Sequence, residues 1–372
     1  MIPYGKQSID EDDIQAVIDV LRSDFLTTGP TVAKFEQSVI SYCGARYGTA
    51  VCNGTAALHA AMFALNIGPG SEVIVPPMTF AATANCVFYV GAMPVFADVE
   101  PNTLLIDPID VERKITDRTR AIIGVDYAGQ PCDWDALHEI AKKHELKLLA
   151  DSCHALGAEY KGRKVGSLAD LTVFSFHPVK QITTGEGGMV VTDHEDLDAR
   201  MKRFRTHGIS TTAEQRENQD TWHYEMVDLG FNYRITDIQC ALGISQMRKI
   251  ESFLARRHEI AAVYDDAFAS FDPVRLLTTM NSNKHAHHLY VIRVDASRRT
   301  EIFKNLRTAG VGVNVHYIPV HFHPYYRTKL CMRPGRCPNA EFAYSQIISL
   351  PIWPKMSKSE VQLVIDAVRR FA

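Results

Sequence analysis

The sequence contains no long apolar segment and no large excess of charge of either sign. No stretch reaches the roughly 18 uninterrupted apolar residues of a membrane-spanning helix, and residues 1–13 lack the apolar core of a signal peptide. Lys and Arg total 40 against 43 Asp and Glu, so the net charge is -3. This balance disfavours nucleic acids and anionic membranes as partners. We therefore expect a cytoplasmic protein that binds neither.

The cysteines and histidines form no recognisable disulfide or metal pattern. The eight cysteines are scattered without a CxxC pair, so neither a disulfide framework nor a zinc site is expected. The histidines gather at residues 285–288 and 316–323 but lack the HxxxH spacing of a helical metal site. We interpret them as polar or substrate contacts, with a metal-dependent enzyme as the remote alternative.

The composition is that of a globular protein, with 372 residues, 46% of them hydrophobic. Up to about residue 190, short apolar runs alternate with helical segments, and several runs are apolar on both alternations. Such runs are typical of strands covered by helices on both faces, so we predict an α/β fold with a mainly parallel sheet. The predicted strands are residues 49–52, 72–75, 94–99, 121–126, 147–151, 171–176 and 188–192.

Capping signals predict the helices outside this region. Residues 8–11 predict the start of a first helix that ends at residues 27–30. Residues 236–239 predict the start of a long helical stretch that reaches about residue 271. Further predicted elements are strands at 288–294 and 312–316, a helix at 297–309 and a last helix capped at 357–360. We expect a large domain over 1–250 and a bridging helix with a small α/β domain over 251–372, with the chemistry in the cleft between them.

Three segments carry residues suited to chemistry. The turn from a strand through Asn53 and Gly54 to Thr55 offers free amide groups and a hydroxyl to a phosphate, although in isolation the motif favours simple helix capping by Asn53 or Thr55. Asp151 ends an apolar strand, where it can face a ligand or cap the next turn. Lys180 lies between an apolar strand and a glycine-rich turn, where a partly buried amine can form a Schiff base.

In order and spacing, these segments resemble the fold-type I pyridoxal-phosphate enzymes, specifically the DegT/DnrJ/EryC family of nucleotide-sugar aminotransferases. The resemblance covers nearly the whole chain and implies an aspartate aminotransferase-like α/β fold. Its most specific motifs are NGTAAL (53–58), DSCHALGA (151–158), FSFHPVKQITTGEGG (174–188), LGFNYRITDIQCALG (229–243) and NVHYIPVH (314–321).

The resemblance implies roles for individual residues. Lys180 would hold pyridoxal 5'-phosphate as a Schiff base and then act as general acid and base, while the cofactor passes through its pyridoxamine 5'-phosphate form. Asp151 would keep the pyridine nitrogen protonated. The other implied cofactor contacts are Gly54, Thr55, Ala56 and Ser175 at the phosphate, Phe80 and His154 at the ring, and Asn232 from the second subunit of a homodimer. For Phe80, a plain core position is the rival interpretation.

The segments at residues 2–7, 24–30 and 314–321 are most similar to the branch of the family that serves pseudaminic acid biosynthesis. That branch implies transfer of an amino group from L-glutamate to C4 of a UDP-4-keto-6-deoxy-N-acetylhexosamine, which gives UDP-4-amino-4,6-dideoxy-N-acetyl-β-L-altrosamine. The implied sugar-nucleotide contacts are Tyr4, Asp24, Phe25, Leu26, Thr27, Val315, His316 and Tyr317.

Three alternatives stay open from the sequence. Bacillosamine- or perosamine-type aminotransferases share the same catalytic residues, because the orientation of the sugar decides the product. A sugar 3-dehydratase has histidine in place of the lysine, so Lys180 argues against it. A non-catalytic protein of the same fold ranks below the enzyme, since both Lys180 and Asp151 are present.

Overall fold

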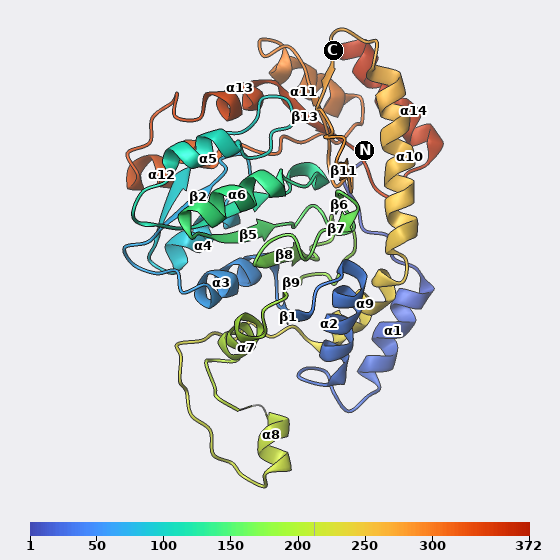
Figure 1. Ribbon diagram of the computed structural model, residues 1–372. Coiled ribbons are helices and arrows are strands. Elements are labelled where there is room, and N and C mark those ends of the chain that lie inside the picture. Colours follow the sequence, from blue (N-terminus) through green and yellow to red (C-terminus); the bar gives the residue numbers. More distant parts are fainter. Residues whose placement is uncertain (212) are drawn as a thin grey trace.

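A seven-stranded sheet forms the centre of the computed structural model, which describes residues 1–211 and 213–372 (Figure 1). The strand order is β1-β9-β8-β5-β4-β2-β3, and β9 is antiparallel to β1 and β8 whereas the other neighbours are parallel. The predicted α/β class with a mainly parallel sheet is therefore confirmed. The strands are β1 (Tyr47–Val51), β2 (Glu72–Val75), β3 (Met93–Phe96), β4 (Thr119–Val125), β5 (Lys147–Asp151), β8 (Leu171–Ser175) and β9 (Gly188–Thr192).

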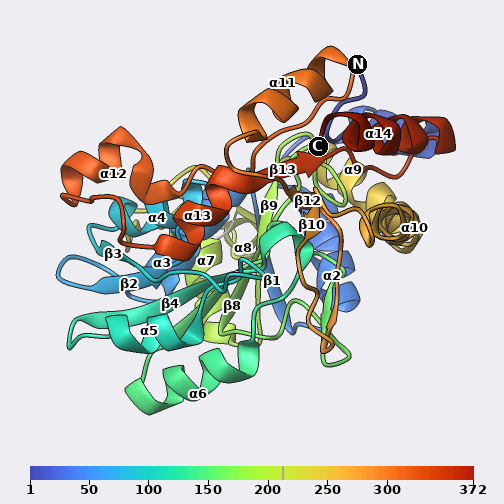
Figure 2. The same cartoon turned by 90° about the horizontal axis from the view of Figure 1, so that it is seen from above.

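Helices cover both faces of this sheet, which explains why its strands are apolar on both alternations. Figure 2 shows α5 and α6 on one face and α3 and α4 on the other. The helices are α1 (Glu11–Leu21), α2 (Pro30–Cys43), α3 (Gly54–Ala64), α4 (Ala82–Tyr89), α5 (Pro108–Lys114), α6 (Trp134–His144), α7 (Glu195–Phe204), α8 (Ala213–Asn218), α9 (Asp237–Met247), α10 (Ile250–Phe268), α11 (Arg299–Thr308), α12 (Pro324–Lys329), α13 (Pro338–Gln346) and α14 (Lys358–Phe371), with 3-10 turns η1 (Tyr127–Gly129) and η2 (Val320–Phe322).

A second hydrophobic cluster lies in the C-terminal part of the chain. The antiparallel sheet β10-β12-β13 packs with α10, α11 and α14 around residues such as Ile292, Ile348 and Val364. Its strands are β10 (Arg275–Leu276), β12 (Tyr290–Arg293) and β13 (Ile347–Leu350), and a further small sheet joins β6 (Glu159–Tyr160), β7 (Arg163–Lys164) and β11 (Asn283–Lys284). The division into domains at residue 250 stays a prediction.

Two predicted helix starts are confirmed by the capping residues. Thr236 caps α9 in a reciprocal pair with Gln239, and Ser357 caps α14 in the same way with Glu360. The helical stretch after residue 236 is broken at residues 248–249. Within the described residues, no helix is long and apolar enough to cross a membrane.

Two predicted elements differ from the structure. The first helix is capped by Asp10, which pairs reciprocally with Asp13, and it ends at Leu21 and not at residues 27–30, where Pro30 instead begins the second helix. The predicted strand at 312–316 is wrong. Val311 and Asn314 there form only isolated bridges, to the N-terminal segment and to β13 respectively, so no continuous ladder develops.

Candidate active site

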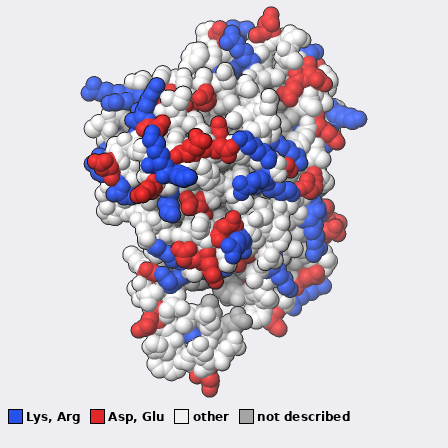
Figure 3. Space-filling model, viewed as in Figure 1, with Lys and Arg blue, Asp and Glu red and all other residues white. Residues whose placement is uncertain are grey.

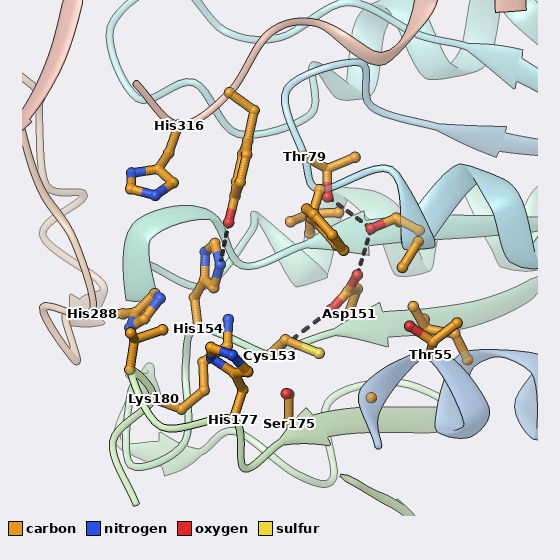
Figure 4. A pocket seen from close by; sticks show the side chains of 18 of the residues that line it. Thr55, Thr79, Asp151, Cys153, His154, Ser175, His177, Lys180, His288 and His316 are labelled. Atoms are coloured by element: carbon orange, nitrogen blue, oxygen red, sulfur yellow. Dashed lines mark hydrogen bonds between the residues drawn. The ribbon is translucent and has the colours of Figure 1, made fainter. Parts of the chain in front are cut away.

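A pocket of about 650 Å³ opens where the parallel strands β4, β5 and β8 end (Figure 4). Val125, Asp151 and Ser175 mark those three strand ends, the first turn of α3 forms one wall, and residues 314–317 form another. Ligand sites of α/β sheets lie at this edge because the loops that follow the strands converge there.

Asp151 is a buried carboxylate of the pocket. It is only 6% exposed, and its two oxygens accept hydrogen bonds from the Thr83 hydroxyl at 2.6 Å and the Cys153 amide at 3.3 Å. No Lys or Arg among the described residues forms an ion pair with it. A buried charge needs a counter-charge, so Asp151 is suited to a ligand that carries a proton on nitrogen.

Lys180 extends into the pocket from the loop that follows β8 (Figure 4). Burial lowers the pKa of its ammonium group, whereas nearby Cys153 and Asp151 act in the opposite direction. A lower pKa increases the fraction of neutral amine, which is the nucleophile in Schiff base formation.

The start of α3 provides an anion site. Asn53 caps the helix by accepting from the Ala56 amide at 2.8 Å, while the Gly54 and Thr55 amides have no protein partner among the described residues. The Ser175 side chain lies opposite, and a Cβ on Gly54 would come within 3.0 Å of the Ser175 Cβ. The glycine therefore allows the Ser175 side chain to lie close to the start of α3, where the two free amides can bind an anion.

His154 is a neutral histidine held in one orientation. Its Nδ1 accepts from the Ala128 amide at 3.3 Å, so the proton lies on Nε2, which is 3.0 Å from the Tyr317 hydroxyl oxygen. Burial and the charge of Lys180 lower the pKa of His154 well below its usual value. Because Nε2 donates to the Tyr317 oxygen, the Tyr317 hydroxyl hydrogen is left for a ligand.

Other predicted residues line the same pocket. Phe80 is 61% exposed with its ring 6.1 Å from that of Tyr317, so it is not a core residue. Tyr4, Val315 and His316 line the pocket as well, and the His316 Nδ1 is 2.9 Å from the Ser349 hydroxyl.

Six predicted residues do not line this pocket. The Ala56 amide is already bonded to Asn53, which leaves Gly54 and Thr55 as the free donors. The remaining five are Asp24, Phe25, Leu26, Thr27 and Asn232. All five are exposed; the 24–27 segment contacts the start of α9, where the Leu26 carbonyl accepts from the Asp237 amide, whereas Asn232 bridges Thr206.

The pocket also contains residues that we did not predict. Cys153 directly neighbours His154 and Thr79 directly neighbours Phe80 in the chain, so sequence proximity is a signal for them. His177, Thr83, Glu186 and His288 lack such a clear signal.

Together, the lone carboxylate, the amine and the anion site fit pyridoxal phosphate, which has a basic ring nitrogen, an aldehyde and a phosphate. This arrangement defines the class of the protein as a pyridoxal-phosphate enzyme of fold type I.

Comparisons with known proteins agree with this class. The family model described as the DegT/DnrJ/EryC1/StrS aminotransferase family matches residues 7–369. SpsC, a spore coat polysaccharide biosynthesis protein of Bacillus subtilis, is 40% identical, with 99% of this chain and 96% of SpsC covered. The chain therefore belongs to the DegT/DnrJ/EryC1/StrS family and is a pyridoxal-phosphate-dependent sugar aminotransferase.

Two solved structures are similar over the whole chain. Spr1654 of Streptococcus pneumoniae, described as a proposed sugar aminotransferase, was solved with pyridoxamine phosphate and with pyridoxal phosphate. The former superposes with a TM-score of 0.95 at 33% identity and covers 100% of this chain and 99% of that one. PseC of Helicobacter pylori, an aminotransferase of pseudoaminic acid biosynthesis, gives a TM-score of 0.93 at 34% identity, with 100% and 98% covered.

Proposed function

We propose that the protein transfers an amino group from L-glutamate to C4 of a UDP-4-keto-6-deoxy-N-acetylhexosamine. The product would be UDP-4-amino-4,6-dideoxy-N-acetyl-β-L-altrosamine, for pseudaminic acid biosynthesis. The observation that carries amino transfer is the convergence of Lys180, Asp151 and the start of α3 on one pocket. The sugar assignment is supported by the N-terminal and 314–321 motifs and by the similarity to PseC.

Different residues of the pocket have different roles in the proposed reaction. Bound pyridoxal phosphate supplies the electron sink that makes removal of a proton next to the amino nitrogen feasible. Asp151 holds the proton on the ring nitrogen, and Lys180 removes and returns protons at the substrate carbon. The free amides of Gly54 and Thr55 bind the phosphate, which fixes the reacting atoms relative to Lys180.

The far wall of the pocket is suited to a sugar. Tyr4 and His316 face each other there with ring centroids 5.1 Å apart, and Val315 and the Tyr317 hydroxyl lie beside them. We propose that the Tyr317 hydroxyl donates to an oxygen of the sugar. Its own oxygen already accepts a hydrogen bond from His154 Nε2, so its hydrogen is free for the sugar. A bacillosamine- or perosamine-type sugar is the second candidate, since these catalytic residues do not determine the sugar.

We also propose a homodimer with shared active sites. The segment around α8 projects from the body of the molecule (Figure 1), and on the face seen in Figure 3 it carries few charged side chains. Large exposed apolar residues on this segment and on the neighbouring 24–27 loop would be covered by a second copy. These residues are Phe25, Leu26, Trp222, Tyr224, Met226, Val227 and Leu229.

The absorbance spectrum of the purified protein tests the function. L-glutamate should convert the visible absorption of the bound cofactor to that of pyridoxamine phosphate, and one candidate UDP-4-ketosugar should reverse the change. Candidate sugars that differ at C4 and C5 identify the acceptor. A spectrum that does not respond to glutamate would contradict the donor assignment, and a response without reversal by any UDP-ketosugar would contradict the proposed acceptor.

A further inference from the structure

Two threonine hydroxyls form a hydrogen-bonded chain that ends on Asp151. The Thr83 hydroxyl donates to Asp151 Oδ2 at 2.6 Å, and the Thr79 and Thr83 hydroxyl oxygens are 2.7 Å apart (Figure 4). Thr79 is 3% exposed and Thr83 1% exposed, so bulk water does not compete for these bonds. Both threonines line the pocket, on the segment that begins α4.

The direction of the hydrogen bonds follows from counting hydrogens. An ionised carboxylate has no hydrogen to offer, so the Thr83 hydrogen must go to Asp151. The Thr83 oxygen is then an acceptor, and the Thr79 hydroxyl must donate to it. The two hydroxyls therefore donate in sequence, Thr79 to Thr83 and Thr83 to one oxygen of Asp151, and the charge favours this order.

The arrangement differs from the usual behaviour of a buried threonine in a helix. A helical threonine normally satisfies its hydroxyl with the backbone carbonyl three or four residues earlier. Thr83 instead bonds the side chain of Thr79 and a carboxylate 68 residues away in the chain. The backbone of the same turn has its own hydrogen bond, in which the Thr83 amide donates to the Phe80 carbonyl at 3.2 Å.

We propose that Thr83, supported by Thr79, is a positioning residue that orients the Asp151 carboxylate and favours its ionised form. One oxygen of Asp151 is thereby fixed by the protein, and the carboxylate can hold the proton on the ring nitrogen of the cofactor. Because Thr79 adjoins Phe80, the same turn places the aromatic ring at the pocket mouth. The proposal rests on the predicted role of Asp151 and is independent of which sugar is used.

The experiment measures how fast pyridoxal phosphate leaves the holoenzyme and whether its ring nitrogen is protonated, by nitrogen-15 NMR of the labelled cofactor. Thr83→Val replaces the hydroxyl with a methyl group of similar size and should release the cofactor about tenfold faster, because a hydrogen bond to a charge is lost. The ring nitrogen signal should shift towards the unprotonated form. Thr83→Ser should restore both values, and Thr79→Val should give a smaller change in the same direction.

A matched control is present in β8. Thr172 is fully buried and its hydroxyl has no partner among the described residues, so Thr172→Val makes the same chemical change without removing a bond. It should release the cofactor at the wild-type rate. If Thr83→Val does not fold, Thr83→Ala and Thr79→Val give the same comparison.

Asp151→Asn distinguishes a failure of the positioning role of Thr83 from a failure of the proposed role of Asp151. If Asp151→Asn releases the cofactor faster while Thr83→Val and Thr79→Val match the wild type, the positioning role is overturned and the role of Asp151 stands. If Asp151→Asn also matches the wild type in release rate and nitrogen signal, the role of Asp151 is wrong and the proposal falls with it.

Discussion

The pocket and an exposed surface outside its lining differ in how far one chain completes them, and we call them the inner and the outer side. On the inner side, which comprises the strand ends, Lys180 and the start of α3, side chains are buried and held by hydrogen bonds within the chain. On the outer side, which comprises residues 24–27, Asn232 and the segment after α8, most side chains are exposed, and several of them are large and apolar. The chain thus builds a preorganised cofactor site by itself, whereas its outer side has the character of a surface that a second copy covers.

The largest effect that we expect comes from the inner side. Lys180→Ala removes the group that moves protons, so turnover with glutamate and ketosugar should fall by at least about 1000-fold. Single-turnover kinetics would measure this loss. Lys284→Ala, which changes an exposed ion pair with Glu159, should behave like the wild type. Full turnover in Lys180→Ala would contradict the assignment of the inner side as the catalytic part.

The buried histidines of the inner side predict a loss of stability in acid. Burial, together with the charge of Lys180, lowers the pKa of His316 to about 4, compared with about 6.5 in the unfolded chain. The unfolded chain therefore binds more protons between these values, and the free energy of unfolding should fall as the pH decreases from 6.5 to 4. His316→Gln should reduce this fall by roughly 2–3 kcal/mol. Urea unfolding across this pH range measures it, and an unchanged pH dependence would show that His316 is not buried in its neutral form.

The sequence predicted some elements of the fold better than others. The bounds of β2, β5 and β9 were predicted to the residue, because strands covered on both faces leave short apolar runs that end sharply. The 312–316 segment, in contrast, has the local pattern of a strand but only single bridges to distant partners, which no local pattern records.

The same limit applies to the active site. Lys180 and Asp151 stand in recognisable local contexts, and the structure brings both to one pocket, although their catalytic roles stay predictions. Thr83 was missed because its bond to Asp151 joins residues 68 positions apart. The location of Asn232 relative to a second copy depends on assembly, which the fold of one chain does not determine.

Mixed dimers test whether the outer side acts across the interface. Asn232→Ala alone should weaken cofactor binding about tenfold, because a hydrogen bond to a phosphate is lost. If Asn232 acts on the partner, a dimer of one Lys180→Ala chain and one Asn232→Ala chain contains one intact site. Such dimers, purified with two different tags, should recover about half of the wild-type activity per dimer, as expected from one intact site in two. No recovery above the Asn232→Ala level would place Asn232 in the site of its own chain.

The smallest expected effect concerns the apolar part of the outer side. Leu229 is 77% exposed, so Leu229→Ser should leave the stability of the isolated chain within about 0.5 kcal/mol of the wild type. It should nevertheless raise the dissociation constant of the dimer several-fold, because the apolar area buried on association decreases. Sedimentation velocity over a dilution series measures this constant. Thr221→Ala, a polar change nearby, serves as the control. If Leu229→Ser lowers the stability of the chain and leaves association unchanged, the outer side belongs to the fold of one chain and the distinction between the two sides disappears.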